Sequence, residues 1–175
     1  MRPLRIPLRQ MLLILFLLWI AALLQGRFAH TVSIRGAEPD LPLVMLSLCA
    51  LLVGGVRGGL FGFWTGLLAA VALPTFYGSV FTGRLAAGIF AGSLGGSLSR
   101  ANLLVPPLVT LAATLLSEIV GTLIAPGPAL HHHRLWLVQT CTELLYNTAL
   151  ALPVSLLLRV CRVGQEEQDT FGMRR

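Results

Sequence analysis

Long apolar runs separated by short polar links organise this chain of 175 residues. A helix needs about 20 apolar residues to cross a bilayer. We predict six membrane-spanning helices, over residues 10–28, 41–56, 59–73, 84–98, 103–125 and 135–158. The second and third are short, so a re-entrant hairpin over 41–73 is the alternative. A hairpin would place Arg57 deep in the membrane at a cost of about 2.5–3.5 kcal/mol, and we therefore favour two short spans with Arg57 at the surface.

The chain divides into a short N-terminal segment, one membrane domain and a polar tail. Residues 1–9 carry three arginines and precede an apolar run, which is the outline of a signal peptide. No small-residue cleavage site follows, so we interpret this run as a first transmembrane helix. The membrane domain covers 10–158 and the tail 159–175. Pro39 followed by Asp40 predicts the start of the second helix.

Glycine recurs every four residues in two series between residues 54 and 96. The series are Gly58, Gly62 and Gly66, and then Gly88, Gly92 and Gly96. A step of four returns to nearly the same helix face, so each series forms a groove without side chains. In lipid, small residues of this kind form the packing surface between helices. We predict that these glycines make close contacts, either between two helices of this chain or with a partner protein.

Composition supports a membrane protein and opposes nucleic-acid binding. Hydrophobic residues make up 55% of the chain and charged residues 11%, which is too apolar for one small water-soluble core. The 13 basic residues, all arginines, stand singly or in small groups between apolar runs rather than on one polar face. Nine lie on one side of the predicted membrane topology and four on the other. The excess predicts that both termini of this multi-pass membrane protein lie in the cytoplasm.

Glu118 and Glu143 are the two acids inside predicted spans, at a similar depth. Ionisable groups there are costly unless they face the bundle or a water cavity. They could share a proton, or one could pair with Arg84; Asn147 lies one turn beyond Glu143. A hydrogen-bonded contact between helices is the favoured interpretation, with ligand binding, partner docking or proton transport as alternatives.

Other candidate chemistry is weaker. Three consecutive histidines, residues 131–133, lie in a predicted loop but do not have a familiar zinc-ligand spacing, so we predict no metal site. The cysteines Cys49, Cys141 and Cys161 are isolated and are interpreted as free thiols. The glycines do not form a phosphate-binding loop. We therefore predict no cofactor and no enzymatic activity.

Several motifs together resemble the rod shape-determining protein MreD family, over about residues 10–162. They are RGAEPDL at 35–41, GGLFGFWTGLL at 58–68, the small-residue fourth helix, and the last helix from Tyr146 and Asn147 to Arg159. Members often carry an aspartate after the third helix's glycines, where this chain has alanines at 69 and 70. The resemblance implies a noncatalytic subunit of the cell-wall elongation machinery. It implies MreC as the first partner, with MreB, RodA and a class B penicillin-binding protein in the same complex.

The resemblance also implies a fold similar to the S-components of energy-coupling-factor vitamin transporters. The overall expectation is thus an all-α membrane protein, a six-helix transmembrane bundle that acts by helix docking. The alternative is a vitamin-binding transporter subunit with an outward-facing pocket near Glu118, Glu143 and Arg84. Such a pocket would need convergent polar and aromatic groups, and this chain offers few.

Overall fold

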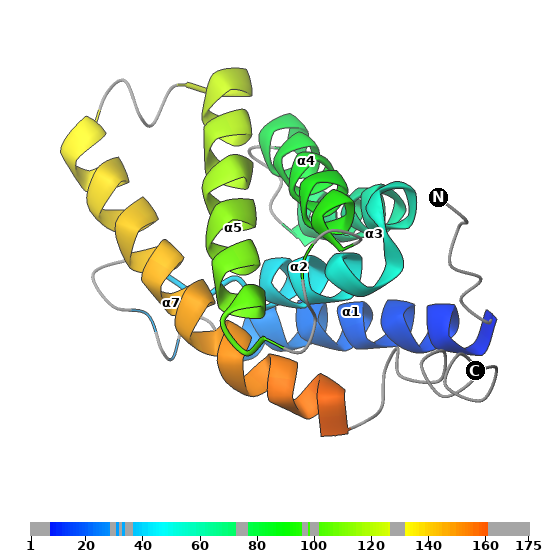
Figure 1. The fold of residues 1–175 in the computed structure, drawn as a ribbon. Helices are drawn as coiled ribbons and strands as arrows, with labels where there is room; N and C mark the ends of the chain where they lie inside the picture. The colour runs from blue at the N-terminus through cyan, green and yellow to red at the C-terminus, as the bar shows by residue number, and fades with distance from the viewer. Residues whose placement is uncertain are drawn as a thin grey trace, which may run out of the picture.

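The computed structural model describes residues 8–28, 31, 33, 37–72, 77–95, 98, 102–126 and 132–160. These residues form an all-helical fold (Figure 1). The helices of the described part are α1 (Leu8–Phe28), α2 (Leu41–Val53), α3 (Gly55–Ala72), α4 (Tyr77–Leu94), α5 (Val105–Ile124) and α7 (His133–Val160). Helices α1, α5 and α7 are each long and apolar enough to cross a membrane, and the chain is therefore described as a membrane protein.

The short helix α2 lies at the centre of the fold. It contacts every other helix of the described part, and ten of its 13 residues are buried. At 1.5 Å per residue it is about 20 Å long, shorter than the roughly 30 Å hydrocarbon core of a bilayer. A helix buried on all sides must be apolar around its whole circumference, which explains the nearly unbroken apolar sequence of α2.

Local signals fix both ends of α2. Asp40 is its N-cap, and the carboxylate oxygen Oδ1 accepts a hydrogen bond of 2.9 Å from the amide of Leu43, as the sequence predicted. At the other end Gly54 has a φ of 92°, a conformation that L side chains rarely adopt. Helix α3 starts at the next residue, so this single glycine forms the whole connection between the two helices.

Helix α4 begins earlier than predicted. The sequence placed the fourth helix at 84–98 after a loop, whereas α4 starts at Tyr77 and ends at Leu94. Thr82 and Gly83 look like loop residues, but the Thr82 hydroxyl donates to the carbonyl of Gly78 one turn earlier. Gly83 packs against Ser117 of α5. Arg84 consequently lies two turns inside α4 and not at its start.

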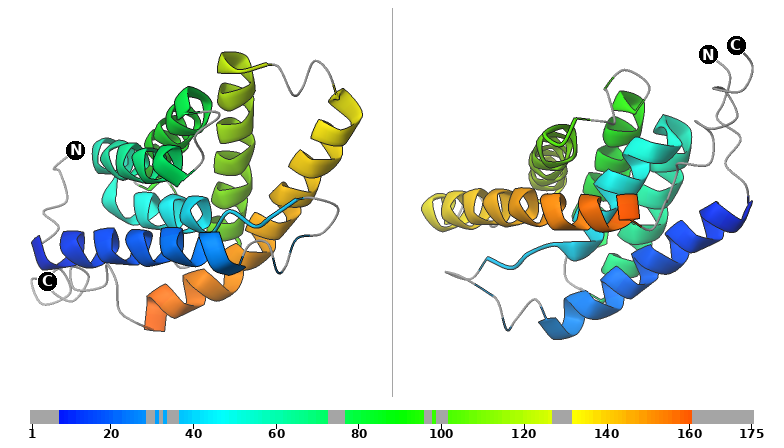
Figure 2. Two further views of the ribbon diagram at one scale, coloured as in Figure 1. Left: turned by 180° about the vertical axis from the view of Figure 1, so that it is seen from behind. Right: turned by 60° about the horizontal axis from the view of Figure 1, so that its bottom comes forward.

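The helices are not all aligned. Helix α1 lies along the base of Figure 1 beside α2, and α5 runs steeply across its direction. Helix α7 crosses near the start of α5, and the two diverge toward the end of α5. In Figures 1 and 2 the beginning of α1 and the end of α7 point to the same side of the molecule.

Candidate functional site

An ion pair between Arg84 and Asp40 is the centre of a buried polar cluster. The guanidinium nitrogen Nη2 of Arg84 lies 2.7 Å from the carboxylate oxygen Oδ2 of Asp40, and the two side chains are 8% and 18% exposed. Nη1 of Arg84 donates to the backbone carbonyl of Thr65 at 3.1 Å. Arg84 therefore joins α4 to the start of α2 and to α3. From the sequence, Glu118 or Glu143 was a possible partner of Arg84. In the structure, Arg84 forms the ion pair with Asp40 instead.

Asn147 connects the ion pair to α5 and α7. Its side chain is fully buried, and its carbonyl oxygen Oδ1 accepts a 2.9 Å hydrogen bond from the backbone amide of Asp40. Its amide nitrogen Nδ2 donates to the hydroxyl of Thr114 at 3.3 Å. The same side chain lies within hydrogen-bonding range of Glu143 one turn earlier. One amide thus contacts the start of α2, the middle of α5 and a second position on α7.

Glu118 on α5 and Glu143 on α7 complete the cluster. Both side chains are half-buried, and each lies within electrostatic range of Asp40. Glu143 is also within range of Glu118 and Arg84. The structure therefore brings together the four polar residues that the sequence singled out inside the membrane. The carboxyl groups of Glu118 and Glu143 thus lie near the ion pair of Asp40 and Arg84.

Gln25 joins α1 to the start of α2 by two hydrogen bonds. Its Nε2 donates to the carbonyl of Pro39 at 2.8 Å, and its Oε1 accepts from the amide of Leu41 at 2.9 Å. Leu41 follows directly after Asp40, so the start of α2 is held from α1, α4 and α7 at once. Sequence reasoning did not select Gln25. Its position as a polar residue at the end of an otherwise apolar span was the available signal.

The buried hydrogen-bonding groups of the cluster are used within the protein. In the part of the chain that the structure describes, every buried side-chain nitrogen and oxygen has a hydrogen-bond partner. Buried polar groups that satisfy one another define one arrangement of the helices, because each alternative leaves a donor or acceptor unpaired. The chemistry that this geometry best supports is interhelical bonding.

The two glycine series lie against each other along the contact between α3 and α4. A Cβ atom added to Gly58 would collide with the carbonyl oxygen of Gly88, and one added to Gly88 would collide with that of Gly58. Added Cβ atoms would also collide with Arg84 at Gly62 and with Gly54 at Gly92, and would press on Phe81 at Gly66. Gly96 lies outside the described residues. These faces are occupied within the chain, so a partner protein would meet other surfaces.

The remaining candidates of the sequence do not join the cluster. His132 and His133 are exposed, and His131 lies outside the described residues. Among those residues no group of three potential ligands could hold a metal ion. Cys49 is buried and Cys141 exposed, both as free thiols, and Cys161 lies outside the described part. Arg57 is half-buried at the start of α3.

No family model, curated protein or solved structure matches this chain.

Proposed function

We propose that this protein is a noncatalytic scaffold subunit of the bacterial cell-wall elongation machinery, a member of the MreD family that holds other membrane proteins in position. The observation that carries the scaffold role is the polar cluster. Its residues bond to one another across α1, α2, α3, α4, α5 and α7. The motifs at 35–41, 58–68 and 146–159 support the family.

A scaffold must keep its shape when partners bind, and the cluster supplies a reason for that rigidity. Arg84, Asn147 and Gln25 meet at the first residues of the central helix α2. The glycines of α3 and α4 add a close backbone contact beside it. Separating any of these helices would expose paired polar groups to hydrocarbon, which is unfavourable.

Besides α3, which exposes Leu60 and Trp64, the outward faces of α1, α5 and α7 are surfaces left for partners. All three carry large exposed apolar side chains, including Leu12, Phe16 and Trp19 on α1, Leu108 and Leu115 on α5, and Leu145 and Leu156 on α7. In a bilayer such faces meet lipid or the transmembrane helices of other proteins. We place MreC on one of them, with MreB, RodA and a class B penicillin-binding protein in the same complex.

We further propose six spans in the inner membrane, with both termini in the cytoplasm. The arginine excess of nine against four supports this orientation. The arrangement of α1 and α7 agrees with it, since the start of one and the end of the other point to the same side (Figure 2). The short α2 would cross within the protein's own interior, where neighbouring helices and not lipid surround it. The short α3 would cross beside it with exposed apolar side chains, such as Leu60 and Trp64, toward the lipid.

Site-specific photocrosslinking in a rod-shaped bacterium tests the role. A photoreactive residue is placed at Leu12 on α1, Leu108 on α5 or Leu145 on α7, each an exposed position. The matched control is Leu46, which is fully buried in α2. We expect cross-links to MreC from one of the three faces and none from Leu46. Absence of any elongation-machinery protein from all three cross-linked samples would refute the proposal.

The transporter alternative has its own test. Purified protein is denatured and the released small molecules are identified by mass spectrometry. A scaffold releases membrane lipids alone. A vitamin-sized compound recovered at one molecule per chain would replace the scaffold with a ligand-binding subunit.

A further inference from the structure

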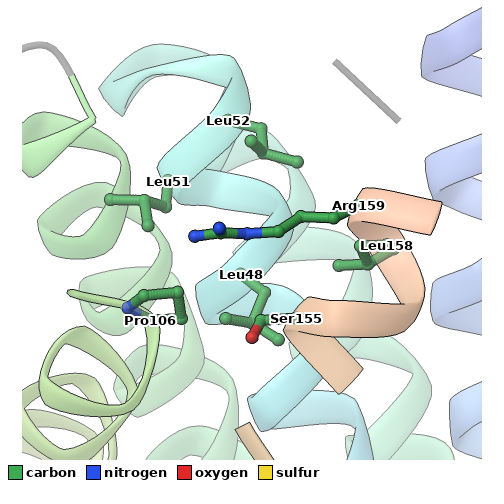
Figure 3. A pocket seen from close by; sticks show the side chains of 7 residues that line it. All are labelled: Leu48, Leu51, Leu52, Pro106, Ser155, Leu158 and Arg159. Carbon is green, nitrogen blue, oxygen red and sulfur yellow. The ribbon is translucent and has the colours of Figure 1, made fainter. Parts of the chain in front are cut away.

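A small cavity lies near the C-terminal ends of α2 and α7, away from the polar cluster. Five apolar side chains line it, from α2, α5 and α7: Leu48, Leu51, Leu52, Pro106 and Leu158 (Figure 3). Its volume is about 50 Å³. One water-sized probe needs about 10–15 Å³, so there is room for only a few methylene groups. Pockets that enclose whole metabolites measure about 300–1,000 Å³.

Two polar residues complete the lining. The Arg159 side chain extends from the last turn of α7 toward α2 and α5, with its guanidinium among Leu51, Leu48 and Pro106 (Figure 3). Its Nη2 donates to the backbone carbonyl of Asn102 at 3.5 Å. The hydroxyl of Ser155 also borders the cavity, and its hydrogen is donated to the carbonyl of Leu152 at 2.8 Å. The cavity thus combines a hydrocarbon lining with one positive charge.

This combination selects a particular class of ligand. An occupant that places only a few methylene groups in the cavity must have most of its mass outside. It must be apolar where it meets the leucines and negatively charged where it meets Arg159. A phospholipid with an anionic headgroup meets these conditions, because its phosphate lies at the membrane boundary directly above its acyl chains. Anionic lipids also attract arginines near the membrane surface by about 1 kcal/mol each.

We propose that the end of the bundle formed by α2, α5 and α7 binds an anionic phospholipid, with the upper part of one acyl chain in the cavity and the phosphate on Arg159. The inference is independent of the scaffold role. A bound lipid would join these three helices from outside, as Asn147 joins them inside.

The first test measures lipid retention by native mass spectrometry. The full-length protein is purified in detergent and incubated with phosphatidylglycerol or phosphatidylcholine. Arg159→Gln removes the charge, and Arg134→Gln removes an exposed arginine at the other end of α7 as the control. We expect Arg159→Gln to lower phosphatidylglycerol retention about fivefold and to leave phosphatidylcholine retention unchanged. Equal phosphatidylglycerol retention by the two variants overturns the proposal.

The second test examines the cavity. Ser155→Val replaces the hydroxyl at the cavity wall by a methyl group and adds a second methyl group. Ser93→Val is the control, since Ser93 is exposed and donates to the carbonyl three residues earlier in the same way. We expect weaker phosphatidylglycerol retention for Ser155→Val alone, at unchanged thermal stability. Unchanged retention overturns the acyl-chain assignment; if Ser155→Val unfolds, the Arg159→Gln result decides. A photoreactive residue at Leu52 gives a further outcome in native membranes. If it cross-links to another protein and the purified complex retains no phosphatidylglycerol, a partner helix and not a lipid occupies this site.

Discussion

Arg84 and Asp40 lie 44 residues apart in the chain, yet their side chains form an ion pair of 2.7 Å in the interior of a membrane protein. The two charges neutralise each other where neither would be stable alone. Asp40 performs a second task with its other carboxylate oxygen, which caps α2 through the amide of Leu43. One residue therefore both begins the central helix and positions α4 against it.

Replacement of Asp40 by Asn separates these two tasks. Asn can still cap α2, but it removes the carboxylate charge that lies 2.7 Å from the Arg84 guanidinium. We expect a loss of about 3–5 kcal/mol of stability, the usual cost of breaking a buried pair. The measurement is unfolding of the purified protein by a denaturing detergent.

A double-mutant cycle identifies the interaction. Arg84→Met combined with Asp40→Asn should cost clearly less than the sum of the two single changes, because no charge is left unpaired. Additive losses would mean that the pair contributes nothing specific. Arg134→Gln, at an exposed position, is the control for the loss of stability caused by removing an unburied arginine charge.

Gly62→Ala tests the contact between α3 and α4. A Cβ at Gly62 would collide with the carbonyl oxygen of Arg84 and lie 3.0 Å from the Cα of Leu85, so the helices must move apart. Overpacking of this kind costs about 1–3 kcal/mol. Gly26→Ala in α1 is the matched control, because no atom lies within 4 Å of its added Cβ. Equal stability of the two variants, measured by thermal unfolding, would contradict the close approach.

The sequence predicted the helices well where hydrophobicity alone defines them. Helices α1, α5 and α7 begin and end within about two residues of their predicted bounds, since a long and mostly apolar run leaves few alternatives. Helix α4 was placed too late, because Thr82 and Gly83 are typical of loops. Their actual roles, a backbone hydrogen bond and a contact with Ser117, depend on neighbours that the sequence does not reveal.

The polar cluster was predicted only in part, for a similar reason. Glu118, Glu143 and Asn147 stand out because they interrupt apolar spans. Asp40 and Gln25 lie at helix ends, where polar residues are expected and attract no further interpretation. Arg84 pairs with Asp40 and not with a glutamate because α2 lies at the centre of the fold. Local patterns do not encode that position.

Asn147→Ala should destabilise the protein more than the loss of one small side chain suggests. It removes the acceptor of the Asp40 amide and the donor to Thr114 together. An unpaired buried backbone amide costs about 1–3 kcal/mol. Thr148→Ala is the control, since the hydroxyl of Thr148 bonds only within α7, to the carbonyl of Leu144. If both variants unfold at the same temperature, Asn147 does not join the helices.

Glu143 distinguishes a hydrogen-bonding role from an ionic one. Glu143→Gln keeps a side chain that can bond to Asn147 and removes repulsion from Glu118 and Asp40, at the loss of attraction to Arg84. We expect Glu143→Gln to remain as stable as the original protein and to keep its function. Glu143→Ala removes the hydrogen bond and should be less stable. If Glu143→Gln instead lowers the unfolding temperature or disturbs cell shape as severely as Glu143→Ala, the negative charge of Glu143 is required.

Thiol labelling tests the proposed topology across α5. Cys141 and Cys161 are replaced by Ser, while Cys49 stays because it is fully buried and cannot react. A single cysteine is then introduced by Asn102→Cys or by Arg134→Cys, at exposed positions on opposite sides of α5. With cytoplasmic termini, a membrane-impermeant maleimide should label Arg134→Cys in intact spheroplasts and Asn102→Cys only after permeabilisation. The reverse pattern would place both termini outside, and labelling of both variants in intact spheroplasts would mean that α5 does not cross the membrane.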